Sequence, residues 1–127
     1  MRRVVKTDKA PAAAGPWSVG WRTGDFIFVA GQGPIDPKTG QLTGTTIQDQ
    51  TQRTLENVAA VLEAEGASMA DVVKVQVILT NMDNFQGMNE VYKKFFGEPF
   101  PARMTYGAAL VLSNMLVEID AIAYVGQ

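Results

Sequence analysis

Apolar positions between residues 47 and 62 recur every three or four residues, which is the spacing of one buried face of an amphipathic helix. A threonine at position 45 or 46, followed three residues later by Gln48 or Asp49, supplies a capping box at its start, and Gly66 ends it. The pattern therefore predicts a long helix with one face in the core. The residues on that face are Ile47, Thr51, Leu55, Val58 and Leu62.

A second helix is predicted to begin near Asp83 or Asn84, where large apolar residues again return at intervals of three and four. It ends at Gly97. Pro99 and Pro101 prevent its continuation, because proline lacks the amide hydrogen that an inner helical turn requires. The apolar face of this helix consists of Phe85, Met88, Tyr92 and Phe95.

Alternating apolar and polar residues, typical of strands, occupy most of the remaining chain. Residues 23–25 form a tight turn that joins the first two of these strands as a hairpin. Residues 31–44 are rich in glycine and proline and form a long loop with a turn at 36–40, and residues 10–18 form a surface excursion. After a short N-terminal strand, the expected strands are Val19–Arg22, Phe26–Ala30, Val72–Thr80, Ala102–Tyr106 and Leu116–Val125.

Two helices can cover only one face of a roughly six-stranded sheet, which makes the chain an α+β protein. The odd positions of the last strand, from Val117 to Val125, are apolar and are expected under the helices. We expect Val73, Val75, Val77 and Leu79 there as well. The even positions of the last strand mix Glu118 and Asp120 with Leu116, Ile122 and Tyr124. Such a face is too apolar for open water and too charged for a core, so we expect another subunit to contact it.

The size and composition of the chain fit one folded domain over residues 1–127, since 46% of the residues are hydrophobic and 19% are charged. No apolar run approaches the roughly 18 residues of a membrane span. The charged start MRRVVKTDKA leads into no apolar segment of a secretory signal, so a cytoplasmic location is the expectation.

Cysteine and histidine are both absent, which removes thiol nucleophiles, disulfides, histidine general bases and the usual zinc sites. We therefore expect no metal. The net charge of −2 is too small to indicate a nucleic-acid partner. The densest basic group, Arg2, Arg3 and Lys6, fits a solvated N-terminal strand equally well.

Arg103 is the strongest candidate for ligand contact among the remaining groups. It follows the stiff segment Pro99–Pro101 into a strand, where its guanidinium offers a planar fork to a carboxylate and Thr105 shares its strand face. From the residues alone, a structural ion pair between Arg103 and Glu118 explains the arginine equally well.

Other candidates also have two interpretations. Glu118 is either a general base whose pKa is raised by partial burial or a solvated carboxylate. Trp17 and Tyr92 fit packing as well as ligand contact, and the backbone amides around Gly31 can form a small anion nest. None of these residues decides the function alone.

Six segments, taken in order, resemble the successive signatures of the reactive-intermediate deaminase family, also called Rid or YjgF-like proteins. The segments are APAAAGPWS, FIFVAGQGPIDPKTGQL, QTQRTLENVAAVLEAEGAS, DVVKVQVILTNMDNF, MNEVYKKFFGEPFPARMT and LVEIDAIA, and they cover about residues 8–124. The resemblance implies a chorismate-mutase-like fold. It also implies a homotrimer with a barrel-like core and three clefts between adjacent subunits.

The resemblance further implies an activity and a site. Family members hydrolyse enamines and imines of small 2-amino acids, such as 2-aminoacrylate, to 2-oxo acids and ammonia. Arg103 in the PAR motif matches the arginine that holds the substrate carboxylate, and Glu118 in VEIDAIA matches the acid that orients or activates water. Asn89 and Tyr92 in NEVY match positions near the cleft, and Gly31 matches the glycine after the third strand.

The implied reaction requires no cofactor, because an imine carbon is already electrophilic. Two other functions stay open. One is a module that binds a small carboxylate, such as a 2-oxo acid, without turnover. The other is a nuclease or translation inhibitor, an activity attributed to some family members, against which the lack of histidine and of a basic stripe argues.

Three positions depart from the family pattern: Trp17 stands where tyrosine is common, Ala30 where serine is common, and Thr105 where cysteine is frequent. The aromatic wall is kept, but polar contacts and a thiol are lost. We expect a wider or less polar pocket, with Trp17 and Thr105 among the substrate contacts.

Overall fold

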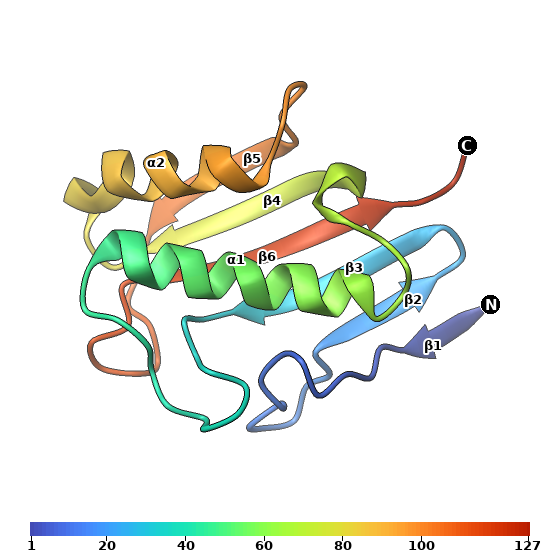
Figure 1. Ribbon diagram of the computed structural model, residues 1–127, viewed down its shortest axis with the longest axis horizontal. Coiled ribbons are helices and arrows are strands. Elements are labelled where there is room, and N and C mark those ends of the chain that lie inside the picture. Colours follow the sequence, from blue (N-terminus) through green and yellow to red (C-terminus); the bar gives the residue numbers. More distant parts are fainter.

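The computed structural model describes residues 1–127 as six strands and two long helices, with one-turn 3₁₀ helices at Met69–Asp71 and Met82–Asn84. The strands form a single mixed sheet in the order β1-β2-β3-β6-β4-β5, and both helices lie on the same face of it (Figure 1). This confirms the predicted α+β architecture. In chain order the elements are β1 (Arg2–Val4), β2 (Gly20–Thr23), β3 (Phe26–Gln32), α1 (Ile47–Glu63), β4 (Val72–Leu79), α2 (Phe85–Phe95), β5 (Ala102–Gly107) and β6 (Val117–Tyr124).

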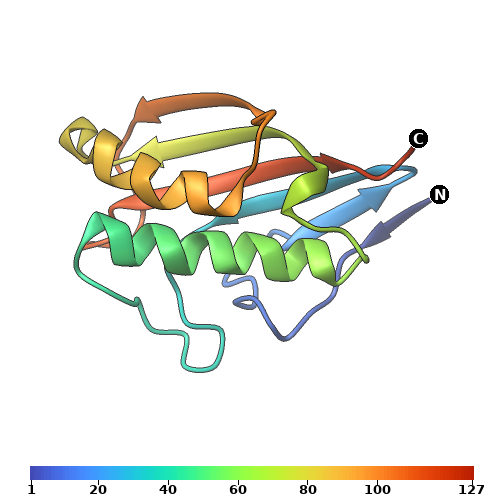
Figure 2. The ribbon, with the colours of Figure 1, turned by 45° about the horizontal axis from the view of Figure 1, so that its top comes forward.

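The topology explains why both helices cover one face. Strands β3 and β4 each pair antiparallel with β6, so they run in the same direction, and β5 pairs parallel with β4. The chain thus makes two successive crossovers between parallel strands, through α1 and then through α2, moving across the sheet in one direction. Crossovers of this kind are right-handed, and two with the same direction and hand place their helices on the same face (Figure 2).

Helix α1 begins as the sequence predicts. Thr46 is its N-cap, and the Thr46 hydroxyl accepts a hydrogen bond of 3.1 Å from the amide of Asp49. Gly66, three residues beyond the last helical residue, has a φ of 75°, which a glycine adopts without strain. All five residues predicted for its apolar face are buried.

Helix α2 begins at Phe85, after the one-turn 3₁₀ helix, and ends at Phe95. Met88 and Tyr92 are buried as predicted, whereas Phe96, the residue after the helix, takes the deep position that the pattern assigns to Phe95. Neither this helix nor α1 is long and apolar enough to cross a membrane.

The core lies between the helices and the sheet, and alternate residues of β6 line it from Val117 to Ala123. On β4 the prediction is wrong at one position. Val73 is 46% exposed and Val72 is buried, because a register shift against β6 between Val72 and Lys74 turns the start of the strand by one residue. Beyond this irregularity Val75, like Val77 and Leu79, is fully buried as expected.

The loop that follows β3 is held by a buried amide. Asn57, on α1, has no exposed surface, and its side-chain nitrogen donates to the carbonyls of Gly33 at 3.0 Å and Ile35 at 2.8 Å. The loop itself starts later than predicted. Gly31 still belongs to β3, where an irregularity between Val29 and Gln32 adds a residue to the strand.

The opposite face of the sheet is not covered by any element of the chain (Figure 2). Glu118 and Asp120 lie on it half-buried, as the sequence predicts. Large apolar side chains surround them with 37–54% of their surface exposed. An exposed apolar face of this extent on a sheet marks a contact surface. Its exposed aromatic and methionine side chains are Trp21, Phe26, Phe28, Met104, Tyr106 and Tyr124.

Candidate functional site

Arg103 lies on the helix-covered face of β5, at the edge of the sheet. Its backbone pairs with Val75, whose side chain is buried under the helices, so the side chain of Arg103 points to the same side, toward α2. The strand begins directly after Pro101, which brings the chain back from the end of α2. Because Arg103 lies on the edge strand β5 but is covered by α2, its side chain is half-buried.

Three side chains of α2 hold this guanidinium. One terminal nitrogen of Arg103 donates to the side-chain oxygen of Asn89 at 2.8 Å. The guanidinium carbon lies 4.7 Å from the centre of the Tyr92 ring and 5.6 Å from that of Phe85, which are cation–π distances. Asn89 and Tyr92, which the family resemblance implies to lie near the cleft, thus contact Arg103, and so does Phe85, which was predicted only as a core residue.

No carboxylate neutralises Arg103. The three salt bridges of the chain all involve other arginines. The single hydrogen bond to Asn89 leaves the remaining guanidinium N–H groups without a protein partner. A planar cation with free donors is arranged to bind a carboxylate from outside the chain.

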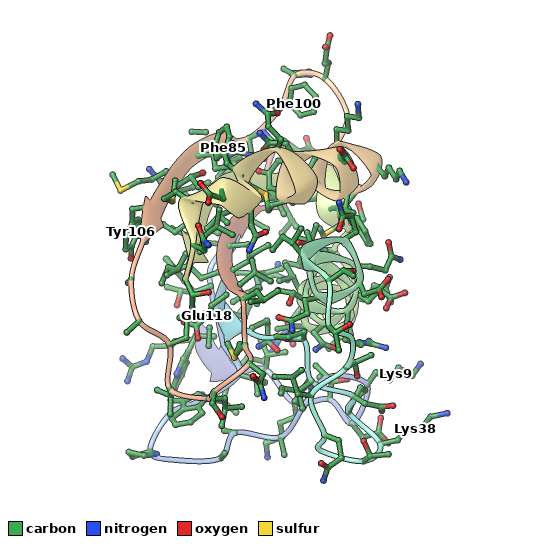
Figure 3. The ribbon with its side chains drawn as sticks, turned by 90° about the vertical axis from the view of Figure 1, so that its left-hand side faces the viewer. Lys9, Lys38, Phe85, Phe100, Tyr106 and Glu118 are labelled. Atoms are coloured by element: carbon green, nitrogen blue, oxygen red, sulfur yellow. The ribbon has the colours of Figure 1, made fainter.

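A cavity of about 360 Å³ opens beside the guanidinium. It lies between α2 and the segment that enters β5, and Figure 3 shows Phe85 and Phe100 beside α2 at this end of the molecule. Its lining residues are Asn89, Tyr92, Lys93, Phe100, Pro101 and Arg103. Lys93, Phe100 and Pro101 were not predicted as site residues; the only sequence signal was the four-residue spacing between Asn89 and Lys93 on one helix face.

Two buried hydroxyl groups near Arg103 lack hydrogen-bond partners. They belong to Tyr92 and to Thr105, which follows Arg103 by two residues on the same strand face. Burial raises the pKa of Tyr92, and the positive charge of Arg103 opposes this rise. Both hydroxyls are neutral groups able to donate to or accept from a ligand.

Glu118 occupies the other face of the sheet. Its side chain alternates with the buried Val117 and Ile119, and Figure 3 shows it with Tyr106 on the side away from α1. Burial raises the pKa of Glu118, and the negative charge of Asp120 raises it further. Asp120 accepts a hydrogen bond of 3.0 Å from the Gln76 amide, which partly offsets the effect of burial on its own raised pKa.

Gly31 lies directly against Glu118. A Cβ atom added at this glycine would stand 2.6 Å from a carboxylate oxygen of Glu118, closer than real contacts allow. The glycine thus gives the carboxylate its space, and no other residue type fits there without moving it. Gly31 and Glu118 therefore form one group.

Trp17 lies in the loop before β2, and its side chain is 54% exposed. Strands β2 and β5 are four positions apart in the sheet, about 19 Å at the usual strand spacing. Trp17 and Arg103 are therefore at opposite sides of one chain, and no contact joins them.

The predicted site residues thus fall into two separate groups. One group is Arg103 with its neighbours on α2 and β5, and the other is Glu118 with Gly31. The alternative in which Arg103 and Glu118 form an ion pair is wrong, because the two side chains lie on opposite faces of the sheet and no salt bridge joins them. No group of three or more acidic side chains is placed to hold a metal ion.

Comparison with known proteins gives the family. Residues 7–125 match the family described as Endoribonuclease L-PSP. The chain is 48% identical over 98% of its length to a RutC family protein of Pyrococcus horikoshii, of which it covers 98%. It is 38% identical over 98% of its length to the 2-iminobutanoate/2-iminopropanoate deaminase of Dermatophagoides farinae, of which it covers 97%.

The solved structures agree. The crystal structure of Escherichia coli TdcF with bound serine has a TM-score of 0.89 and 38% sequence identity, over 96% of this chain and 98% of that one. With family match, sequence relatives and fold in agreement, the chain belongs to the Rid/YjgF family, the family of the reactive-intermediate deaminases.

Proposed function

We propose that this protein hydrolyses imines and enamines of small 2-amino acids to 2-oxo acids and ammonia. The observation that carries the proposal is the guanidinium of Arg103, which lies in a cavity with free N–H donors and no acidic partner. Relatives of this chain are named for that reaction, and a small amino acid is bound in one of the related structures.

Arg103 binds the substrate carboxylate in this proposal. A bidentate pair of hydrogen bonds fixes the plane of the carboxylate, and Asn89 keeps the guanidinium from rotating. The hydroxyl of Thr105 and the ring of Tyr92 complete the contacts on this side. The substrate is thereby oriented for attack at the imine carbon next to the carboxylate.

Glu118 acts on water in the same proposal, and the two groups meet only between two copies of the chain. Because Arg103 and Glu118 lie on opposite faces of one sheet, a neighbouring subunit must bring its Glu118, Gly31 and Trp17 to the Arg103 cavity. The exposed apolar face around Glu118 supports such a contact. We propose a homotrimer with one such cleft at each of its three subunit boundaries.

The reaction at this cleft is a hydrolysis in two steps. Glu118 takes a proton from water as the water oxygen bonds to the imine carbon, and it gives this proton to the imine nitrogen, so that a carbinolamine forms. Glu118 then takes the proton of the new hydroxyl group and gives it to the nitrogen as the carbon–nitrogen bond breaks, so ammonia leaves and the carbonyl of the 2-oxo acid forms. The raised pKa of Glu118 suits a group that both accepts and gives a proton during the reaction.

A coupled assay tests the proposal. A pyridoxal-phosphate-dependent dehydratase releases 2-aminoacrylate from serine, and lactate dehydrogenase reports pyruvate as it forms. We expect the protein to accelerate pyruvate formation over the spontaneous rate, and Arg103→Ala to remove the acceleration. A rate equal to that in buffer would refute the proposed activity.

A carboxylate-binding module without turnover is the second candidate. One chain alone presents a complete carboxylate-binding group and lacks a nearby acid, which favours binding without catalysis. Calorimetric binding of 2-oxobutyrate, together with no hydrolysis of any imine, would support this function instead.

The family description also names an endoribonuclease. The surface argues against RNA as a substrate here, because the N-terminal basic group is partly neutralised: Arg3 pairs with Glu65 at 2.6 Å. Any cleavage of RNA by a preparation should be lost in Arg103→Ala before it is assigned to this chain.

A further inference from the structure

The cavity beside Arg103 contains a second cation that the proposed reaction does not use. Lys93 lines the cavity together with Arg103, and none of the six lining residues is acidic. Lys93 takes part in none of the three salt bridges of the chain. Within one chain, two cations without an acidic partner therefore line one open cavity, which attracts a ligand with two negative charges.

The spacing of the two cations follows from α2. Asn89, which binds the guanidinium of Arg103 at 2.8 Å, precedes Lys93 by four residues on the same helix. The base of the lysine side chain thus lies about 6 Å further along the helix than that of Asn89, four residues at about 1.5 Å each. The flexible four-carbon stem of Lys93 lets its ammonium reach a carboxylate over a range of distances from Arg103, which suits a ligand with a second carboxylate, such as a four- or five-carbon diacid.

The cavity also offers room and walls for the carbon chain between the carboxylates. Its volume of about 360 Å³ equals that of roughly twelve water molecules, more than the smallest imino acids fill. Phe100 and Pro101 form one apolar wall, and the ring of Tyr92 lies beside Arg103. Methylene groups of a substrate pack against these surfaces while its ends meet the two cations.

We propose that Lys93 gives this protein a preference for imino acids that carry a second carboxylate, such as the imines of glutamate and aspartate. The inference rests on the proposed function and names its substrate class. Arg103 binds the carboxylate next to the imine carbon, and Lys93 binds the distal carboxylate. Water adds to the imine carbon and ammonia leaves, so the products are a 2-oxo diacid and ammonia.

The test compares a diacid imine with a monoacid imine in matched variants. Amino-acid oxidases generate the imines of glutamate and alanine in place, and dehydrogenases for 2-oxoglutarate and pyruvate report the products. Lys93→Ala is expected to lower kcat/KM for the glutamate imine about threefold to fivefold, as for a solvent-exposed ion pair. The value for the alanine imine should stay unchanged. Lys94→Ala, the adjacent lysine outside the cavity, is the control and should change neither.

Three results would overturn the proposal. The first is an equal effect of Lys93→Ala on both imines, and the second is no effect on either. The third is a preference for the imine of leucine or phenylalanine that survives Lys93→Ala, which would assign the cavity to an apolar side chain. In support, 0.5 M salt should reduce the diacid preference of the wild-type protein. The Debye length is about 10 Å at 0.1 M salt and is shorter at 0.5 M, so salt weakens the attraction between Lys93 and the distal carboxylate.

The absence of imine hydrolysis and the absence of a diacid site can be told apart by experiment. If no imine is hydrolysed, calorimetry with the products still tests Lys93. Tighter binding of 2-oxoglutarate than of pyruvate, lost in Lys93→Ala and kept in Lys94→Ala, would support the diacid site. Equal binding of the two acids would contradict it.

Discussion

Replacing Arg103 with alanine removes the charged donor that we expect to hold the substrate carboxylate. The change leaves Asn89, Tyr92 and Phe100 in place, so the walls of the cavity persist. A substrate can still enter, but its carboxylate then faces an amide and two rings in place of a guanidinium. The expected defect is therefore in binding and orientation, and the fold should be little affected.

The magnitude follows from the hydrogen bonds that are lost. A hydrogen bond to a charged group contributes about 1.5–3 kcal/mol, and the guanidinium has free donors for two such bonds. Each 1.4 kcal/mol is tenfold, so the loss of two such bonds in Arg103→Ala should lower kcat/KM by about 100-fold to 10,000-fold. Arg103→Lys keeps a charge but loses the planar fork, and should lower kcat/KM by about tenfold.

The assay is the dehydratase-coupled formation of pyruvate, with Arg53→Ala as the matched control. Arg53 also donates to an asparagine at 2.8 Å, but it lies on α1 and outside the Arg103 cavity. Its loss should leave kcat/KM within twofold of the wild type. Equal losses in the two variants, or full activity of Arg103→Ala with an unchanged circular dichroism spectrum, would refute the assignment of Arg103.

Three further predictions concern the acid group and the loops. Gly31→Ala should lower kcat at least tenfold with a small change in thermal midpoint, because the new methyl group displaces the Glu118 carboxylate; unchanged kcat would separate Gly31 from the site. Burial raises the pKa of Glu118 and Asp120 above their ordinary values of 4.5 and 3.8, so the folded chain binds protons more tightly than the unfolded one. The free energy of unfolding should therefore fall as the pH rises from these ordinary values through the raised pKa values. In urea titrations at fixed protein concentration, the free energy of unfolding of Glu118→Gln should depend less on pH than that of the wild type. Asn57→Ala leaves two loop carbonyls without their donor and should destabilise the chain by about 2–4 kcal/mol, measured by urea denaturation against Asn84→Ala, whose side chain makes no capping hydrogen bond.

The sequence predicts the elements and their buried faces well, because periodicity reports burial directly. The apolar faces of α1 and β6 follow from spacing alone, and the cap at Thr46 from its side-chain chemistry. The position of Val73 could not be predicted in this way. A strand irregularity shifts every side chain before it to the other face, and nothing in the apolar run Val72–Val73 shows where it falls.

Which faces of the sheet Arg103 and Glu118 occupy relative to each other could not be predicted from the sequence pattern either. Alternation places side chains relative to one another within a strand, but the phase between two strands depends on their register. Here Val75 pairs with Arg103 and Ile78 with Glu118, which puts the two side chains on opposite faces. The family resemblance named both residues, and only the register separates them. Lys93 and Phe100 could not be predicted either, because they come together only where α2 passes over the start of β5.

A mixing experiment tests most directly the claim that each site joins Arg103 of one copy to Glu118 of another. Arg103→Ala and Glu118→Gln chains are each purified as inactive proteins, unfolded together in equal amounts and refolded. If the site spans two copies, random assembly pairs an intact Arg103 with an intact Glu118 at about one quarter of the boundaries, ½ × ½, and restores about one quarter of the wild-type activity. If the mixture stays as inactive as its two components while forming the same oligomers, the two residues do not act across a boundary, and the account is wrong.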